Sequence, residues 1–312
     1  MPSVKVAKSL IGANERDDMA IPALMYHHIS PTPGAHTVSP ENFRIQLQWL
    51  ADSGIRTISA SEFDQWRQGS LTLEGPSVLL TFDDGWLDNW VYALPLLKEF
   101  NAKAVFFVVT SWPGEGTVRR DLGGSGWEAP THEEAMASVK GSAKDGVVMR
   151  WSELLASKAS GLVELASHSH THGSWWDNQR SWPMILDALR EDLYKSQIIL
   201  SHQQGEPSNL FCWPKGQFGL EMIEVAKEVG FEVQFSTLRG CNSPAPFRLV
   251  RRINAENQGQ EWISSRIRVY RDPLRGSLLG LAHQTLQRLR MQQKFQAIAP
   301  KDEFRFPFLS LI

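Results

Sequence analysis

Two neighbouring carboxylates follow a buried apolar stretch, and they are the residues of this chain best placed to do chemistry. Residues 78–82 form an apolar, partly β-branched run that ends in Asp83, Asp84 and Gly85. Such a run is typical of a core strand in a parallel sheet, where functional groups gather at the carboxyl ends of the strands. Adjacent carboxylates in an apolar setting repel each other unless they share a cation or a proton. The alternative is that one aspartate caps the helix expected to begin near Asp88.

Three histidines follow a second apolar stretch and supply the other half of a metal site. Residues 161–165 are typical of a strand, and His168, His170 and His172 come just after it. Catalytic zinc sites use three protein ligands and keep the fourth position for water. His168, His172 and one of the two aspartates would complete such a set, with zinc as the default metal and cobalt, nickel or iron as alternatives. His170 could replace either neighbour, although a hydrogen bond outside the metal shell is its more ordinary role.

The aspartate that does not bind metal is free to take a proton from water. Bound zinc lowers the pKa of water to about 7, which brings the proton within reach of a carboxylate base. This chemistry suits the hydrolysis of an amide or an ester. A glycosidase instead needs two carboxyls roughly 5 to 10 Å apart across the sugar. Neighbouring residues at one strand end are poorly placed for that, so cleavage of a sugar bond ranks low.

The stretches that must position these groups alternate between strand and helix patterns, which is typical of parallel βα units. A count of seven or eight strands favours a barrel over an open doubly wound sheet. We expect strands at 21–26, 55–58, 78–82, 104–109, 162–166, 210–213, 231–235 and 247–253. We expect helices at 40–53 (capped by Ser39), 61–68, 87–100 (despite Pro95), 151–159, 185–202 and 220–229. Between 111 and 149 the pattern fails, which predicts a long loop at the edge that carries the site.

Composition excludes several classes of protein. The chain has 312 residues, an ordinary length for one α/β barrel, and a net charge of −2 without a nucleic-acid signature. Cys212 and Cys241 form no disulfide framework, so a reducing compartment is expected. We find neither an apolar signal core near the start nor a run of eighteen apolar residues. These features predict a cytoplasmic protein that binds no nucleic acid.

Three motifs taken together resemble the polysaccharide deacetylases, also called carbohydrate esterase family four. Residues 81–85 (TFDDG) and 167–172 (SHSHTH) are similar to the first two motifs of that family. Residues 211–216 (FCWPKG) resemble the third, although Lys215 stands where the family more often has Tyr or Phe. The opening LMYHHI at 24–29 and the closing RRIN at 251–254 are similar to the branch that deacetylates poly-N-acetylglucosamine.

The resemblance implies a distorted (β/α) barrel of about seven parallel strands and metal-dependent removal of N-acetyl groups from an amino sugar. It implies that Asp83 is the catalytic base, and that a divalent metal is held by Asp84, His168 and His172. It places the catalytic acid at His27, and histidine is suited to donate a proton near neutral pH. A buried core histidine is the alternative for His27. His28 points the other way on a strand and is expected to be structural.

The third motif would face the substrate. The oxyanion is expected on the metal and on a backbone N–H near Trp213, with Pro214 fixing the turn that presents it. Lys215 removes the usual aromatic wall, and our hypothesis is that its cation meets a phosphate or an acidic sugar. Trp175 and Trp176 either supply a sugar-stacking face or plug the core, and the sequence leaves both alternatives open.

Three segments follow from these patterns: a leader at 1–20, a catalytic domain at 21–257 and a C-terminal tail at 258–312. The tail combines leucines with arginines and is predicted to form a basic amphipathic helix, with apolar residues Leu278, Leu279, Leu281, Leu286, Leu289 and Met291. Such a helix lies on an anionic membrane or docks on a partner. The alternative is a helix packed on the barrel with its arginines in solvent. Membrane contact would place the protein peripherally at the inner face, where a lipid-linked sugar or lipopolysaccharide precursor would be the substrate.

The function predicted from the sequence is a metal-dependent hydrolase that removes N-acetyl groups from an amino sugar in a polysaccharide or glycolipid. One alternative is an amidohydrolase acting on a small non-sugar amide. The other is an inactive glycan-binding protein on the same scaffold. Intact Asp83, Asp84, His168 and His172 argue against an inactive protein.

Overall fold

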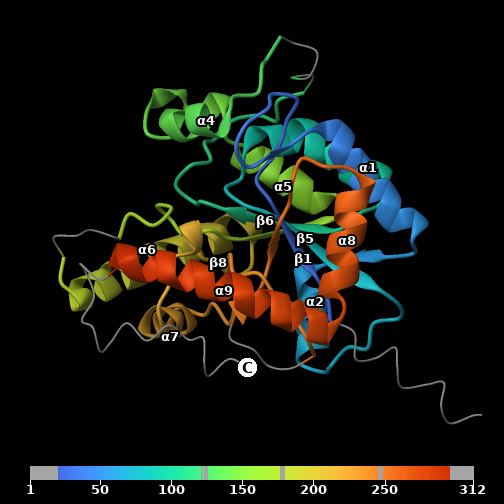
Figure 1. Cartoon of the computed structure of the whole chain (residues 1–312). Helices are drawn as coiled ribbons and strands as arrows, with labels where there is room; N and C mark the ends of the chain where they lie inside the picture. Colours follow the sequence, from blue (N-terminus) through green and yellow to red (C-terminus); the bar gives the residue numbers. More distant parts are fainter. Residues whose placement is uncertain (1–19, 121, 123–125, 176–179, 245–248, 296–312) are drawn as a thin grey trace, which may run out of the picture.

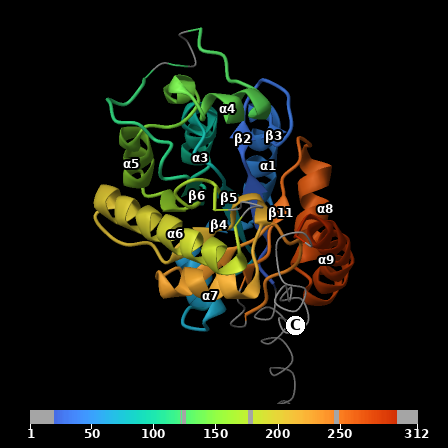
Figure 2. The ribbon, with the colours of Figure 1, turned by 90° about the vertical axis from the view of Figure 1, so that its left-hand side faces the viewer.

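Short buried strands run parallel in one sheet, and helices cover its outside (Figures 1 and 2). The computed structural model describes residues 20–295 except 121, 123–125, 176–179 and 245–248. The main strands are β1 (Ala23–Tyr26), β5 (Ser77–Phe82), β6 (Ala104–Val108), β7 (Val163–Ser167), β8 (Leu210–Cys212) and β9 (Val233–Phe235). The strand β4 (Arg56–Ile58) pairs with the first half of β5, and β2 (His28–Ile29) pairs with β3 (Thr37–Val38) outside the main sheet. The parallel pairing predicted from alternating strands and helices is confirmed.

A single extended segment brings the two ends of the sheet together. The strand expected at 247–253 is split into β10 (Leu249–Val250) and β11 (Ile253–Asn254). The first half pairs with β9 and the second half pairs with β1. The segment therefore bridges the last and first strands of the ring, with Arg251 and Arg252 at the break. This arrangement confirms the distorted (β/α) barrel.

The helices are α1 (Pro40–Asp52), α2 (Ala60–Arg67), α3 (Leu94–Glu99), α4 (His132–Ser138), α5 (Trp151–Ala159), α6 (Trp182–Gln204), α7 (Leu220–Glu228), α8 (Gln260–Tyr270) and α9 (Pro273–Phe295), with short turns η1 (Asn89–Ala93), η3 (Ser142–Gly146) and η4 (Pro214–Gly216). Serine and threonine side chains cap the starts of α1, α2 and α4 among the helices. Ser39 caps α1 by accepting the N–H of Asn42, and Pro40 takes the first position as expected.

The helix expected at 87–100 is confirmed, because the chain is helical from residue 87 to residue 99. Its middle, η1, is a π-helical turn that continues directly into α3, and Pro95 follows that turn. Proline has no N–H to donate to the preceding turn, and the wider turn of η1 accommodates it without ending the helix.

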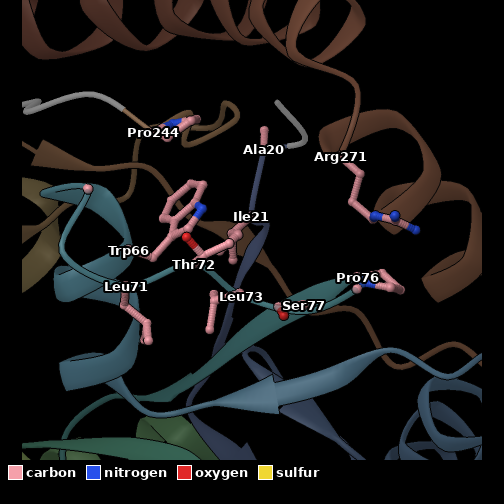
Figure 3. Close-up of a pocket in the computed structure, with 12 residues that line it drawn as sticks. Ala20, Ile21, Trp66, Leu71, Thr72, Leu73, Pro76, Ser77, Pro244 and Arg271 are labelled. Carbon is pink, nitrogen blue, oxygen red and sulfur yellow. The ribbon is translucent and has the colours of Figure 1, made fainter. Parts of the chain in front are cut away.

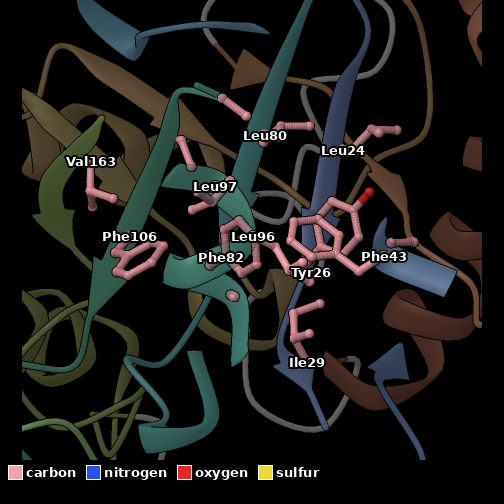
Figure 4. Packing of buried hydrophobic residues seen from close by; sticks show 14 of the residues in the cluster. Leu24, Tyr26, Ile29, Phe43, Leu80, Phe82, Leu96, Leu97, Phe106 and Val163 are labelled. Carbon is pink, nitrogen blue, oxygen red and sulfur yellow. The ribbon is translucent and has the colours of Figure 1, made fainter. Parts of the chain in front are cut away.

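Aromatic rings fill the space between the sheet and the helices near the site (Figure 4). Phe82 stacks on Tyr26 at a centroid distance of 5.1 Å and meets Phe106 edge-on at 5.2 Å. The Tyr26 hydroxyl donates to Gln46 Oε1 at 2.7 Å, so its buried polar atom is satisfied. These contacts fix the end of β5, from which the two aspartates project.

The first helix of the expected tail is part of the barrel. The inner face of α8 contributes buried residues to the same core cluster as β1 and β5, namely Trp262, Ile263, Ile267 and Tyr270. Figure 1 shows α8 beside α1. For α8, the alternative of a helix packed on the barrel therefore holds, whereas the domain boundary at 257 stays a prediction.

The segment 111–149 is not the structureless loop predicted from its sequence. It contains α4 and η3, and Trp86 forms an antiparallel bridge with Val148. Trp112, Ala135 and Val148 pack with Trp86 in a small cluster of their own. Scattered apolar residues without a clear period conceal such a satellite core in the sequence. The expected position of the segment is confirmed, because Trp86 directly follows the Asp83–Gly85 turn.

A separate cavity opens at the amino ends of the strands (Figure 3). Its volume is about 430 Å³, and its lining includes Trp66, Leu71, Ser77 and Arg271. Ser77 is the first residue of β5, whereas Asp83 and Asp84 follow the last. The cavity therefore lies at the opposite end of the barrel from the carboxylate–histidine site.

Candidate metal centre and active site

The two loops that carry the expected ligands have unusual backbone geometry. Asp84 and Gly85 follow β5 with φ values of 79° and 81°. Ser169 and His172 follow β7 with φ values of 69° and 56°. Left-handed backbone is uncommon outside glycine and costs free energy, so it persists where surrounding contacts enforce it. These turns direct the side chains of Asp84 and His172 toward each other.

Asp84, His168 and His172 converge as the sequence predicts. Asp84 Oδ1 lies 3.3 Å from Nε2 of His168 and 3.3 Å from Nε2 of His172. Asp84 Oδ1 is buried and has no hydrogen-bond partner among the residues that the structure describes. Burial alone would raise the pKa of Asp84, but the two imidazoles outweigh it and hold that pKa well below its usual range. An orphaned carboxylate oxygen facing two imidazole nitrogens fits a divalent cation.

Neighbouring groups fix the orientation of these ligands. His168 Nδ1 lies 2.9 Å from the carbonyl oxygen of Cys212. Because a carbonyl only accepts, Nδ1 carries a proton, and Nε2 is therefore the nitrogen that would bind a cation beside Asp84. Asp84 Oδ2 accepts the indole N–H of Trp86 at 2.9 Å. The remaining oxygen, Oδ1, is thereby left for the cation.

Asp83 lies in a different environment from its neighbour. Arg252 grips its carboxylate with two bonds, Nη1 to Oδ1 at 2.7 Å and Nη2 to Oδ2 at 2.9 Å. Burial raises the pKa of Asp83, but Arg252, together with His168 and His27, lowers it by more, so the net shift is downward. Asp83 is therefore ionised near neutral pH. The sequence around Arg252 carries no signal for this contact, which was not predicted.

A second set of potential ligands is formed by Asp83, His168 and Cys212. Two of them already contact a cation of the protein, the guanidinium of Arg252. Arg252 Nη2 lies 2.9 Å from Cys212 Sγ as well as contacting Asp83. The two cysteines are buried and free, as expected.

His27 lies beside the expected base. Its Nε2 is 3.9 Å from Asp83 Oδ2, and its side chain is 16% exposed. Burial lowers the pKa of His27 to about 4, although Asp83 opposes the shift. The position suits the expected acid, a role that stays a prediction. His28 is buried, with Nδ1 2.5 Å from Asp88 Oδ2 and Nε2 3.1 Å from His132 Nδ1, which agrees with the structural role expected for it.

His170 does not replace either ligand. Its Nδ1 lies 3.1 Å from Thr110 Oγ1, outside the ligand set. Its backbone N–H, together with that of Thr171, donates to the buried carboxylate of Asp192 on α6, at 2.8 and 3.0 Å. Asp192 thus holds the loop between His168 and His172 in its left-handed geometry. The sequence offered only an acidic residue on an amphipathic helix, which is no signal for this role.

The expectations for the substrate side fare less well. The backbone N–H of Trp213 donates to the carbonyl of Phe235 at 3.0 Å, so it is not available to an oxyanion. Pro214 lies in η4 as expected, and Lys215 in the same turn is exposed with a φ of 58°. Trp175 is only 2% exposed and packs in a core cluster with α6 and α7, which favours a core plug and contradicts a stacking face. Trp176 lies outside the described residues.

Comparisons with known proteins agree with this geometry. A family model described as polysaccharide deacetylase matches residues 71–234, slightly more than half of the chain. The chain belongs to the polysaccharide deacetylase family. The match includes Asp83, Asp84, His168 and His172, whereas His27 and Arg252 lie outside it.

Two relatives of this chain are named poly-beta-1,6-N-acetyl-D-glucosamine N-deacetylase. That of Escherichia coli O157:H7 is 21% identical over 274 residues, covering 80% of this chain, and that of Staphylococcus aureus (strain MRSA252) is 24% identical over 205 residues, covering 64%. The matches span 38% and 61% of those relatives' own lengths. The solved structure of IcaB from Ammonifex degensii has a TM-score of 0.65 at 22% identity and covers 81% of this chain and 98% of its own. That likeness supports the shared fold.

We predict that Asp192→Asn weakens metal binding without unfolding the protein. The amide has one acceptor oxygen in place of two, so one of the N–H groups of His170 and Thr171 loses its partner and the ligand loop relaxes. Metal affinity should fall by about tenfold or more, measured by competition with a chelator. Glu191→Gln changes the exposed neighbour on the same helix and should leave affinity unchanged. Equal affinity in the two variants would contradict the role of Asp192.

We predict that Arg252→Gln moves the acidic limb of the pH–rate profile to higher pH. Without the guanidinium, less positive charge opposes the effect of burial on Asp83, so its pKa rises and the carboxylate ionises only at higher pH. Breaking the buried pair should also cost about 3 to 5 kcal/mol of stability, measured by denaturant unfolding. In the native protein this stabilisation is present above the unfolded-state pKa of about 3.9 and is lost as pH falls through the lower folded-state value.

Arg252→Lys is the second variant, because it keeps a charge but not the double hydrogen bond. It should shift the limb less than Arg252→Gln does. An acidic limb that stays in place in both variants would show that Arg252 does not tune Asp83.

Proposed function

We propose that this chain is a metal-dependent N-deacetylase that acts on an N-acetylated amino sugar in a polysaccharide or glycolipid. The observation that carries the proposal is the buried Asp84 Oδ1, which faces two imidazole nitrogens at 3.3 Å and lacks a hydrogen-bond partner among the described residues. Membership of the family and the names of the two relatives support an N-acetyl sugar as the substrate class.

Asp84, His168 and His172 would hold the divalent metal. A bound divalent ion supplies Lewis-acid polarisation of the amide carbonyl and a lowered pKa for water. Two imidazoles and one carboxylate suit zinc, which is our proposed ion. Lys215, exposed in the η4 turn, remains our candidate for contact with a phosphate or acidic group of the substrate, and the oxyanion donor of this turn stays a prediction.

Asp83 would accept the proton of the attacking water. Its carboxylate is ionised and is held by Arg252 at a fixed orientation, which supports a role as general base. Arg252 also limits rotation of the carboxylate, so Oδ2 stays on the side of His27. The base is thus preorganised before the substrate arrives.

His27 would donate a proton to the departing amine. With a pKa lowered to about 4, its imidazole is neutral before the reaction at neutral pH and must first gain a proton. Asp83 is the group that gains one in the first step, and its Oδ2 lies 3.9 Å from His27 Nε2. We propose that the proton moves first from water to Asp83. It then moves to His27, either directly after the two side chains come closer or through one bridging water, and finally to the amine nitrogen.

Metal analysis combined with acetate release tests the proposal. His168→Ala should lose both the metal and the activity, because it removes one of the three ligands. Asp83→Asn should keep the metal and lose acetate release by about a hundredfold or more, because it removes the base. His170→Ala is the matched control and should keep the metal, since its imidazole contacts Thr110 instead of the ligand set. Retained metal in His168→Ala, or full activity in Asp83→Asn, would overturn the assignment.

The substrate class is tested with a panel. Acetate release should be highest with N-acetylglucosamine oligomers or a lipid-linked N-acetyl sugar and low with small non-sugar amides. The reverse order would favour the amidohydrolase alternative. Oligomer binding without acetate release by the metal-loaded protein would favour the glycan-binding alternative.

A further inference from the structure

The C-terminal helix α9 packs on the barrel through its glycine face, although its leucines would be the usual residues to bury. Gly276 and Gly280, one helical turn apart, are its buried positions in the part whose side chains the structure describes. A Cβ added at Gly276 would lie 2.9 Å from Cys241 Cβ and 3.3 Å from the Cα of Tyr270. The helix therefore approaches the barrel through glycine, whose missing side chain allows that closeness.

The leucines of α9 point away from the barrel. Leu274, Leu278 and Leu281 are 71%, 61% and 42% exposed, and their spacing of four and three residues places them on one face of the helix. Leu279 flanks this face and is 44% exposed. A helix that packs only on its own domain turns leucine inward, as α8 does with Ile263 and Ile267. An exposed row of leucines is typical of a surface that binds an apolar partner, such as another protein or a membrane.

Charge indicates what kind of surface that is. The sequence of α9, residues 273–295, contains four basic residues and no Asp or Glu. Over residues 266–295 the chain has seven basic residues and a single acidic one, Asp272. Two copies packed through this face would bring like charges together, which costs free energy. An apolar row on a helix whose sequence contains cations and no acidic residue is instead complementary to a lipid surface with anionic headgroups.

The helix α9 does not lie over the candidate active site. Figures 1 and 2 show the helix on the outside of the barrel, next to α8 and away from α4, which covers the carboxyl ends of the strands. None of the helices in the described ranges is both long enough and apolar enough to span a bilayer. We infer that α9 is a peripheral membrane-binding helix that lays Leu274, Leu278 and Leu281 into the interface of an anionic bilayer.

Sedimentation with lipid vesicles tests this inference on the full chain. The protein should bind vesicles of phosphatidylcholine containing about one third phosphatidylglycerol, bind phosphatidylcholine alone far less, and be released by salt. The variant Leu274→Ser, Leu278→Ser, Leu281→Ser should bind the anionic vesicles about tenfold more weakly, because the apolar area that enters the interface is lost. These side chains are exposed, so the fold is expected to survive their replacement.

A matched control uses equally exposed apolar residues on another helix. Met184 and Ile198 on α6 are 56% and 51% exposed, and Met184→Ser, Ile198→Ser should bind vesicles like the native protein. Equal binding to neutral and anionic vesicles, or an α9 variant that binds like the native protein, would overturn the inference. So would a native dimer in solution that the α9 variant converts to a monomer, because the leucines would then pack against a second copy.

Acetate release from a soluble oligomer separates this inference from the proposed function. The α9 variant should keep the native rate in solution while losing vesicle binding, since the helix lies away from the site. Loss of both would indicate that α9 supports the fold and would overturn the membrane assignment. Vesicle binding by a native protein that releases no acetate would leave the inference standing and remove only the deacetylase proposal.

Discussion

The buried ion pair between Asp83 and Arg252 links the closure of the barrel to its chemistry. Arg252 lies at the break between β10 and β11, in the segment that joins the last strand of the ring to the first. Its guanidinium donates to Asp83, to Thr81 Oγ1 at 3.0 Å and, through Nε, to the carbonyl of Ser236 at 2.9 Å. A buried charge is tolerated only when it is paired and its hydrogen bonds are filled, and both conditions are met here. The contact that orients the candidate base therefore also ties the closing segment to β5.

The candidate metal ligands depend on a different set of supports, which includes elements outside their own loops. The carbonyl of Cys212 on β8 fixes the tautomer of His168, and Asp192 on α6 holds the backbone between the two histidines. Trp86, which is fixed in place by the segment 111–149, occupies the second oxygen of Asp84. Left-handed residues such as Ser169 and His172 persist because these contacts outweigh the local strain. These contacts are present without any ligand, as a preorganised site requires.

The features that depend on local sequence pattern were predicted from the sequence. Apolar runs ending in Asp83–Asp84 and His168–His172 indicated two strand ends, and the parallel fold brings such ends to one edge. The missed features are long-range. The partnership of Arg252 with Asp83 joins residues 169 positions apart, and nothing near Arg252 in the sequence names its partner. The sequence near Trp213 likewise does not show that its N–H donates to the neighbouring strand β9. The burial of Trp175 depends on how α6 and α7 pack, which is also a long-range feature.

Adjacent aspartates at a buried strand end pose an electrostatic problem, and the structure indicates how it is solved. The left-handed turn at Asp84 separates the two side chains, so that each carboxylate meets its own partners. Asp83 receives a permanent cation, the guanidinium of Arg252, which is charged at every physiological pH. Asp84 receives imidazoles and one indole N–H, and these leave one oxygen without a hydrogen bond. The first carboxylate is complete within the protein, whereas the second keeps one oxygen that a cation would complete. This asymmetry fits the two different roles that we propose for these neighbouring aspartates, a base and a metal ligand.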